Sequence, residues 1–400
     1  MKESEMKFLG YPRPDGSAGI RNYVLVLPGG FFAAKICDTV AGTRTIVTAD
    51  NGSGRTSADR ETIGRTLIGL GSNPNVASVI VHSQSPGAGY PELKPSHLAE
   101  EIARSGKWVE FIDNVQEGGT FRALEKGIQT ARKMVLEASR IRRQPFDLSR
   151  LALGVKCGHS DTTSGIAGNP VIGNLFDRLV EAGGTAFFGE TTEIIGAEHI
   201  LARRGINQEV AEKILQVAAD TEKMAKLTGE DIRTINPVPS NIAGGISTLE
   251  EKSLGAIHKA GSSPIQGVLS YGERPPGKGL YFVDNWMNSA SIFAGYAAAG
   301  AQLVIFQLGG GGLSGEDLLY TSSAVVSPLM WTTANPRTLA MAPTSLDFYS
   351  GRVIEGKETI EEAGEKLLQT VLEIASGTLT RVETLRYINP TQLYLREPCF

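Results

Sequence analysis

The chain has 400 residues, which is more than one hydrophobic core usually serves, so two or three domains are expected. It carries 39 basic and 43 acidic residues, a formal net charge of -4, and 41% of its residues are hydrophobic. This balance argues against binding to nucleic acid or to an anionic membrane surface, and indicates a globular protein with a sizeable core.

The cysteines and the N-terminal sequence indicate the cellular setting. The start, MKESEMKFLGY, has no apolar region of a secretory signal, and no run approaches a membrane span. Three widely separated cysteines, Cys37, Cys157 and Cys399, make neither a disulfide framework nor a CxxC metal motif. A reducing, cytoplasmic setting is therefore expected.

In the first part of the chain, β-branched runs alternate with helical periodicity. Ile63, Leu67 and Leu70 have the spacing of one helix face between two such runs. The basic run RIRRQPFD (140–147) predicts a solvated helix end and a linker, so we place a boundary near 145–150. We expect strands at 22–28, 76–84 and 108–114, and helices at 60–70, 96–106 and 119–143.

The second part alternates in the same way. We expect strands at 151–158, 185–190, 265–271, 279–285 and 301–308, and helices near 170–182, 194–205, 207–228, 244–261 and 358–377. Strands that alternate with helices indicate α/β layers with mostly parallel sheets. The sequence therefore predicts two layered α/β domains, at 1–148 and 149–400, the second carrying most of the functional site.

The first of four polar clusters is VKCGHSDTTSGIAGNP, at 155–170. It follows a predicted strand, and parallel α/β sheets bind ligands beyond the carboxyl ends of their strands. Hydroxyls and free N–H groups at a helix start favour an anion, although they could also form an elaborate N-cap. If the strand continues extended, Cys157 and His159 project to one face and Lys156 to the other.

The second cluster is GETTEIIGAEH, at 189–199. Glu190 ends a strand, and Glu193 lies in the first helical turn. Paired carboxylates suit general acid–base chemistry or a hard metal, whereas first-turn glutamates can also just complement the helix dipole. Glu190 gains nothing from a dipole, so it is the stronger functional candidate.

Two glycine-containing clusters follow. In NIAGGISTLEEKSLGAIHKAG (241–261), Asn241 with Gly244 and Gly245 could cradle an anion, while the glutamates and lysines could form a solvated face. FQLGGGGLSG (306–315) would let a ligand approach the backbone, but it is no nucleotide-binding motif.

Together the clusters favour a small, polar, anionic substrate. A base (Glu190, Glu193 or Lys156) could take a proton beside a carboxylate while a β-substituent leaves. Cationic groups or a divalent metal would stabilise the developing charge.

In several long motifs the chain resembles the altronate/galactarate dehydratase family, which includes the large subunit of sulfolactate sulfo-lyase. The resemblance covers most of 8–395 and rests on four motifs: GYPRPDGSAGIRNYVLVLP (10–28), KCGHSDTTSGIAGNP (156–170), ETTE (190–193) and 241–261. It implies a lyase that removes water, or in one branch sulfite, from a hydroxy acid to give a 2-keto acid. It also implies Fe(II) or another divalent metal, a separate small subunit of about a hundred residues, and a homo-oligomer.

Three segments depart from the family pattern. The sugar-acid dehydratases of the family have a cysteine- and histidine-containing stretch where this chain reads TADNGSGRTSADR (48–60). They have a Gly-Cys-Glu-like turn where it reads SQSPGAG (83–89). A family Gly-Arg-Gly is Gly309–Gly311 here. Hydroxide needs a Lewis acid or a proton donor to leave, whereas sulfite departs readily. We expect dehydration, with sulfite release as the alternative and a non-catalytic carboxylate-binding subunit as a further one.

The expected site residues fall into three groups. The catalytic group is Lys156, Ser160, Asp161, Glu190 and Glu193. The substrate-binding group is Thr162, Thr163, Ser164, Asn169, Asn241, Gly244, Gly245 and Lys252. The metal ligands are Cys157 and His159, although Cys157 could also be a packed strand thiol.

Overall fold

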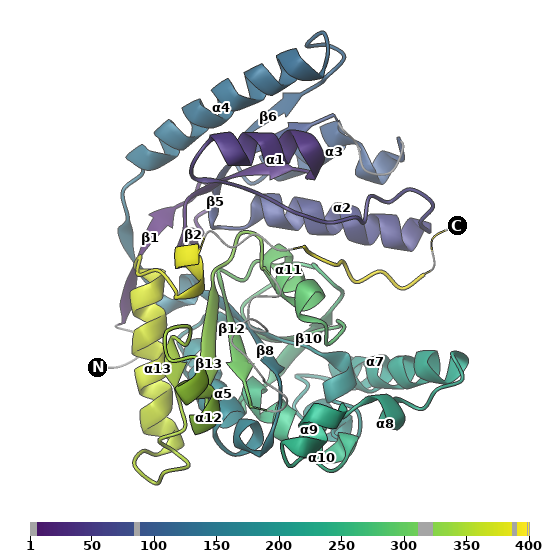
Figure 1. Ribbon diagram of the computed structural model, residues 1–400, viewed down its shortest axis with the longest axis vertical. Helices are drawn as coiled ribbons and strands as arrows, with labels where there is room; N and C mark the ends of the chain where they lie inside the picture. The colour runs from purple at the N-terminus through teal and green to yellow at the C-terminus, as the bar shows by residue number, and fades with distance from the viewer. Residues whose placement is uncertain (1–5, 84–88, 311–322, 386–389, 398, 400) are drawn as a thin grey trace.

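The structure is a computed structural model that describes residues 6–83, 89–310, 323–385, 390–397 and 399. It confirms the expected α/β fold, because helices cover a four-stranded and a seven-stranded sheet whose strand pairs are all parallel (Figure 1). No helix in these ranges is long and apolar enough to cross a membrane.

The four-stranded sheet has the order β4-β3-β5-β6. Its strands are β3 (Tyr23–Leu27), β4 (Thr43–Thr45), β5 (Val76–His82) and β6 (Trp108–Ile112). Alternate residues of β3 enter different cores: Val24 and Val26 pack with helices α1 (Gly30–Thr39) and α4 (Thr120–Arg140). Leu25 and Leu27 pack with α2 (Ser57–Ser72) and α3 (Pro95–Ala103). This alternation is what a strand covered on both faces requires.

The seven-stranded sheet has the order β10-β11-β9-β8-β12-β13-β14. Its strands are β8 (Ala152–Gly158), β9 (Thr185–Phe188), β10 (Ile265–Leu269), β11 (Gly279–Val283), β12 (Leu303–Leu308), β13 (Leu329–Thr333) and β14 (Phe348–Tyr349). One face packs against α5 (Asn169–Glu181), α7 (Gln208–Leu227) and α13 (Ile360–Ala375). The other face packs against α11 (Ser289–Ala299), which contacts α2, so the two large sheets share one core (Figure 1).

A small antiparallel sheet of order β2-β1-β7 was not foreseen. Strand β1 (Lys7–Pro12) pairs with β2 (Ala18–Gly19) and with β7 (Gln144–Asp147). Strand β7 falls in the basic run that the sequence analysis assigned to a linker. Strands β1 and β7 are more than 130 residues apart in the chain, so their pairing produces no local periodicity from which it could be predicted.

Two expected helices are shorter than the sequence suggested. In place of a helix over 194–205, the structure has only α6 (Glu198–Ala202). The expected helix at 244–261 is α10 (Leu249–Ala256) followed by a 3-10 turn, Ile257–Ala260. The residues that were expected to be helical but are not lie in turns next to the site.

Asn75 connects the two large sheets through buried hydrogen bonds. Its Nδ2 donates to the backbone oxygens of Gln302 at 2.7 Å and Val326 at 3.0 Å. Its Oδ1 accepts from the backbone N–H groups of Ile20 and Arg21. Asn75 therefore satisfies four buried backbone groups from segments far apart in sequence.

The Asn75→Ala variant is expected to lose about 2–3 kcal/mol of unfolding free energy, because these backbone groups lose their partner. Urea denaturation measures the loss. The matched control is Asn51→Ala, since Asn51 is exposed and accepts only from the backbone N–H of Ser53 among the described contacts. Equal stability of the two variants would refute the bridging role.

Candidate functional site

The candidate site lies where β8 and β9, neighbours in the seven-stranded sheet, come to an end. Strand β8 stops at Gly158 because His159 adopts a left-handed backbone with φ 49°. Glu190, just after β9, has φ 70°. Left-handed backbone costs a non-glycine residue roughly 1–2 kcal/mol, and such strain concentrates at functional sites. The extended continuation to His159 assumed above is therefore wrong.

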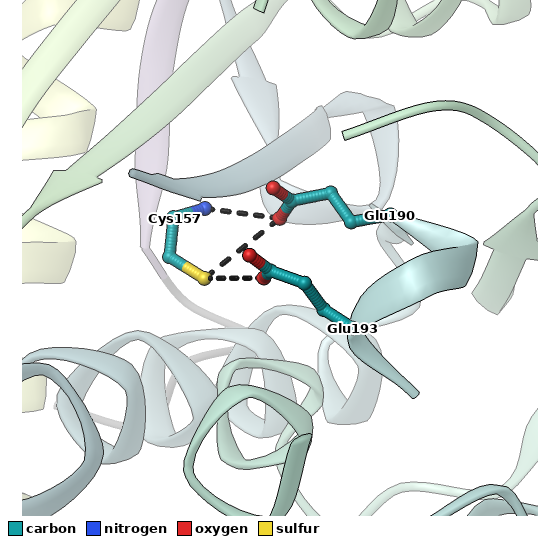
Figure 2. A group of neighbouring side chains, drawn as sticks. All are labelled: Cys157, Glu190 and Glu193. Atoms are coloured by element: carbon teal, nitrogen blue, oxygen red, sulfur yellow. Dashed lines mark hydrogen bonds between the residues drawn. The ribbon is translucent and has the colours of Figure 1, made fainter. Parts of the chain in front are cut away.

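Cys157, Glu190 and Glu193 point toward one another from the ends of these two strands (Figure 2). Glu190 Oε2 lies 3.1 Å from the Cys157 backbone nitrogen and 3.8 Å from its Sγ, and Glu193 Oε2 lies 3.0 Å from that Sγ. All three side chains are buried, and their ligand atoms lie within 4.8 Å of one another. By residue type and spacing, this group could hold a metal ion.

Three buried lysines surround the same carboxylates. Lys156 Nζ lies 3.1 Å from Glu190 Oε1 and forms an ion pair with it, although this oxygen accepts no hydrogen bond from the described residues. Lys252 Nζ lies 3.2 Å from Glu193 Oε1. Lys259 Nζ contacts Glu190 Oε2 and lies 3.2 Å from Glu193 Oε2. These six residues form what we call the ionic cluster: Lys156, Cys157, Glu190, Glu193, Lys252 and Lys259.

Mutual electrostatics fix the protonation states inside the ionic cluster. Burial alone would raise the pKa of Glu193, but the charges of Lys252, Lys259 and Lys156 outweigh it and hold that pKa well below its usual value. Burial would lower the pKa of Lys259, but Cys157 and the two glutamates raise it well above its usual value. Burial, followed by the charge of Glu193, raises the pKa of Cys157 to about 12. Near neutral pH the cluster therefore holds a carboxylate at Glu193, an ammonium at Lys259 and a neutral thiol.

Cys157 is therefore expected to resist alkylation in the native protein. With a pKa of about 12, only about one thiol in ten thousand is ionised at pH 8, and the thiolate is the reactive form. Iodoacetamide followed by peptide mass mapping should show modified Cys399, which is exposed, and unmodified Cys157. Denaturation should make both react. Native labelling of Cys157 as fast as Cys399 would contradict the closed cluster.

The lysines differ in how many acceptors each ammonium group meets. Lys252 has three oxygens within 3.2 Å, from Asn236, Asn241 and Glu193. Lys259 also has three acceptors. Lys156 donates to the Cys157 backbone oxygen at 2.6 Å, forms an ion pair with Glu190 Oε1, and lies 5.1 Å from the centroid of the Phe306 ring. Among these lysines, Lys156 therefore meets the fewest oxygen and sulfur acceptors.

A cavity of about 510 Å³ opens onto one side of the ionic cluster. Lys156, Cys157, Glu193, Asn241 and Lys252 contribute to its lining. The segments that begin near 156, 190 and 241 thus meet at one cavity, as the sequence-based hypothesis required. Among the described residues of the cluster, Glu190 and Lys259 lie behind this lining.

Other predicted residues shape the cavity wall. Ser160 lines it, and its hydroxyl has no protein partner within the described ranges. Asn241 Nδ2 donates to the Ser160 backbone oxygen at 2.9 Å, so Asn241 ties this loop to α9 (Pro239–Ala243). His159 also lines the cavity, but the group of neighbouring metal-ligating atoms comprises Cys157 and the two glutamates without it.

The remaining predicted residues lie next to this cavity. Asp161 accepts from Ser164 and Thr163 through Oδ1, and from Gly310 N and Asn335 Nδ2, both at 2.6 Å, through Oδ2. Its carboxylate is therefore occupied in holding loops together, which favours a positioning role.

A second cavity of about 260 Å³ shares Ser160 and Lys252 with the first, and it is also lined by Thr162, Ser164 and Asn169. Gly244 and Gly245 pack so closely on Asp161 and Thr162 that a side chain at either position would clash.

Two parts of the site were missed. Lys259 was not among the expected site residues and was considered for a solvated face, although its spacing of seven from Lys252 places both on one side of a helix. Residues 287–290, at the N-terminus of α11, line the cavity and follow β11, so the strand-end rule could have found them. Residues 84–88 and Gly311, which belong to the departures noted above, lie outside the described residues.

Similarity to known proteins agrees with this picture. Residues 148–395 match the family described as D-galactarate/altronate dehydratase, C-terminal, and residues 10–139 match D-galactarate dehydratase/altronate hydrolase, second domain. The chain is 36% identical over 395 residues to (2R)-sulfolactate sulfo-lyase subunit beta of Chromohalobacter salexigens, covering 97% of each chain.

Two dehydratases are also similar. Altronate dehydratase of Bacillus subtilis is 31% identical over 390 residues, which cover 94% of this chain and 75% of that one. Galactarate dehydratase (L-threo-forming) of Escherichia coli is 29% identical over 322 residues, which cover 78% of this chain and 59% of that one. The chain therefore belongs to the D-galactarate/altronate dehydratase family, as its motifs predicted.

Proposed function

We propose that this chain catalyses β-elimination from a small hydroxy-carboxylate and gives a 2-keto acid. Membership of a family whose similar members are named dehydratases and a sulfo-lyase confirms the broader prediction of a hydroxy-acid lyase. The observation that carries the proposal is the convergence of Lys156, Glu193 and Lys252 on one polar cavity.

Substrate binding would use the positive side of the cavity. Asn288, Ser289 and Ala290 place the N-terminal end of the eleven-residue helix α11 in the wall, and a helix N-terminus attracts anions. The free hydroxyl of Ser160 adds a hydrogen-bond donor. A substrate carboxylate held here would lie in the field of the fixed ammonium of Lys252.

Lys156 is the proposed proton acceptor. Glu190 lies behind the lining, and the lowered pKa of Glu193 makes its carboxylate a weak base. Lys156 lines the cavity, and it must act in its amine form. The ammoniums of Lys252 and Lys259 balance the two glutamates, so the cluster stays charge-balanced when Lys156 is an amine.

In the proposed step, the Lys156 amine takes the proton from the carbon next to the substrate carboxylate. The electron pair of that C–H bond forms a carbon–carbon double bond, and the leaving group departs from the β-carbon with its bonding pair. Sulfite leaves as it is, whereas hydroxide takes up a proton as it departs and leaves as water. The resulting enol takes up a proton at the β-carbon, loses the proton of its hydroxyl group and so becomes the 2-keto acid. The fixed charges of Lys252 and Lys259 stabilise the negative charge that develops.

Two leaving groups fit this scheme. Dehydration is the first candidate, since altronate and galactarate dehydratases are among the similar proteins. Sulfite is the second, because the sulfo-lyase subunit matches along 97% of both chains. An iron ion, as the family resemblance implied, would have to be held by Cys157, Glu190 and Glu193. These residues do not fit such an ion, because the ammonium of Lys259 already lies among their ligand atoms.

A separate small subunit and a homo-oligomer are part of the proposal. The sulfo-lyase relative is named as a subunit beta, which supports an enzyme of more than one kind of chain.

The purified chain, with and without a candidate small partner, should be incubated with altronate, galactarate and (2R)-sulfolactate. The expected result is a 2-keto acid from at least one substrate, and an equal amount of sulfite if sulfolactate is the substrate. A folded protein that yields no keto acid from any of them, with the partner present, would overturn the proposal.

A further inference from the structure

We propose that the ammonium group of Lys259 fills the position between Cys157, Glu190 and Glu193 that a divalent metal ion would otherwise take, so that this centre works without a metal there. The inference concerns the site of the elimination proposed above, and it depends on that function only for its activity measurements.

The contacts of Lys259 are those expected of a cation at the centre of the group. Its Nζ lies 3.1 Å from Cys157 Sγ and 3.2 Å from Glu193 Oε2, and it also contacts Glu190 Oε2. These are the residues whose ligand atoms could coordinate a metal. An ammonium has three N–H donors, so these three acceptors complete its hydrogen bonding. The same three atoms would occupy three coordination positions of a metal ion.

The hydrogen-bond network around the thiol closes without a metal. The Cys157 thiol lies 3.0 Å from Glu193 Oε2, to which it can donate, while its sulfur accepts from Lys259. Glu190 Oε2 also accepts from the backbone N–H of Cys157. The three candidate ligands are thus already joined to one another and to Lys259.

Charge also opposes a metal at this position. The outer oxygen of each glutamate already faces a second ammonium, Lys156 at Glu190 Oε1 and Lys252 at Glu193 Oε1. Even with Lys156 as an amine, the ammoniums of Lys252 and Lys259 already balance the two carboxylates, so a dication would leave two uncompensated positive charges in a buried site, which is costly.

The turn that carries Lys259 packs closely on a helix. Its side chain is buried, and it belongs to the 3-10 turn Ile257–Ala260, which packs on α5. At Gly173 of α5 an added Cβ would overlap the backbone oxygen of His258, which shows how closely the turn approaches the helix. The same packing keeps the ammonium between the glutamates. Lys259 does not line the cavity, so it is a positioning residue that does for Glu190 and Glu193 what a bound cation would do.

The first test is the metal content of the active wild-type protein, assembled with its small partner if activity requires one. Elemental analysis should find far less than one divalent ion per chain, and dialysis against a chelator should leave turnover and the unfolding temperature unchanged. One tightly bound ion per chain whose removal abolishes activity and whose return restores it would overturn the inference.

The second test creates the metal position by removing the ammonium. Folded Lys259→Ala should bind about one Co(II) per chain with a thiolate-to-cobalt absorption band, which should vanish in the Lys259→Ala/Cys157→Ser double variant. Wild type and the control Lys223→Ala, which alters an exposed lysine of α7, should show no such band. Two results would contradict the inference that the ammonium takes the metal position. One is a thiolate-to-cobalt band in the wild type, and the other is the absence of this band in folded Lys259→Ala.

Kinetics separate positioning from simple loss of fold. Lys259→Met, which keeps most of the side-chain volume, should lower kcat by about 100-fold or more while KM changes little, because preorganised charge acts mainly in the transition state. An unchanged kcat would overturn the inference. If Lys259→Ala fails to fold, the kinetics of Lys259→Met and the metal analysis of the wild type still test the inference. A folded wild type that contains no metal and forms no keto acid would refute the proposed function, but it would remain consistent with this inference.

Discussion

Glu190→Gln is expected to lower the free energy of unfolding by about 3–5 kcal/mol and to abolish turnover. The carboxylate is fully buried and faces two ammonium groups, those of Lys156 and Lys259. A neutral amide leaves these charges without their partner in a site that water does not reach. The same change displaces Lys156, which is the proposed proton acceptor. Chemical denaturation and the keto-acid assay measure the two effects.

The control for this prediction is Glu250→Gln. Glu250 also pairs with a cation, Arg233, at 2.7 Å, but both side chains are 42% exposed. Exposed ion pairs contribute about 0–1 kcal/mol, so this variant should keep its stability and its turnover. If Glu190→Gln were as stable as Glu250→Gln, the ionic cluster would not be the buried, charge-paired unit described above.

Gly173→Ala is expected to lower stability by about 3 kcal/mol, even though alanine is the better helix former. Gly173 lies inside α5, and a Cβ there would overlap the His258 backbone oxygen and lie 2.9 Å from Gly261 N. The clash pushes the turn that carries Lys259 away from the helix. Turnover should therefore fall together with stability.

The matched control is Gly277→Ala, where an added Cβ would have its nearest neighbour, Tyr281 Oη, at 3.6 Å. Thermal unfolding and turnover of the two variants should be compared under the same conditions. A Gly173→Ala protein as stable and as active as Gly277→Ala would show that the turn can move freely. Close packing of α5 would then not fix the position of Lys259.

The sequence predicted the class of the fold and the convergence of the site for one physical reason. Parallel strands bring their carboxyl ends to the same edge of a sheet, so polar residues in the last positions of β8 and just after β9 had to lie near one another. This placed Lys156, Glu190 and Glu193 together. The order of the seven strands could not be read from local periodicity, since it depends on packing between distant segments.

Lys259 was missed because surface and interior lysines look alike in a sequence. A lysine on a helix is normally solvated, and only its partners from β8 and from the turn after β9 make its burial possible. The end of β8 was missed for a related reason. The alternation of side chains along an extended strand does not predict the left-handed backbone of His159, because this conformation depends on the surrounding fold.

The most direct test of the account compares wild type with Lys156→Met, which keeps the aliphatic stem and removes the amine. Keto-acid formation and calorimetric binding of the same hydroxy acid should be measured on both folded proteins. The account predicts that wild type forms the keto acid, and that Lys156→Met still binds the hydroxy acid but forms no product above background. Turnover by Lys156→Met at the wild-type rate would contradict the assignment of proton transfer to this residue, and hence the mechanism.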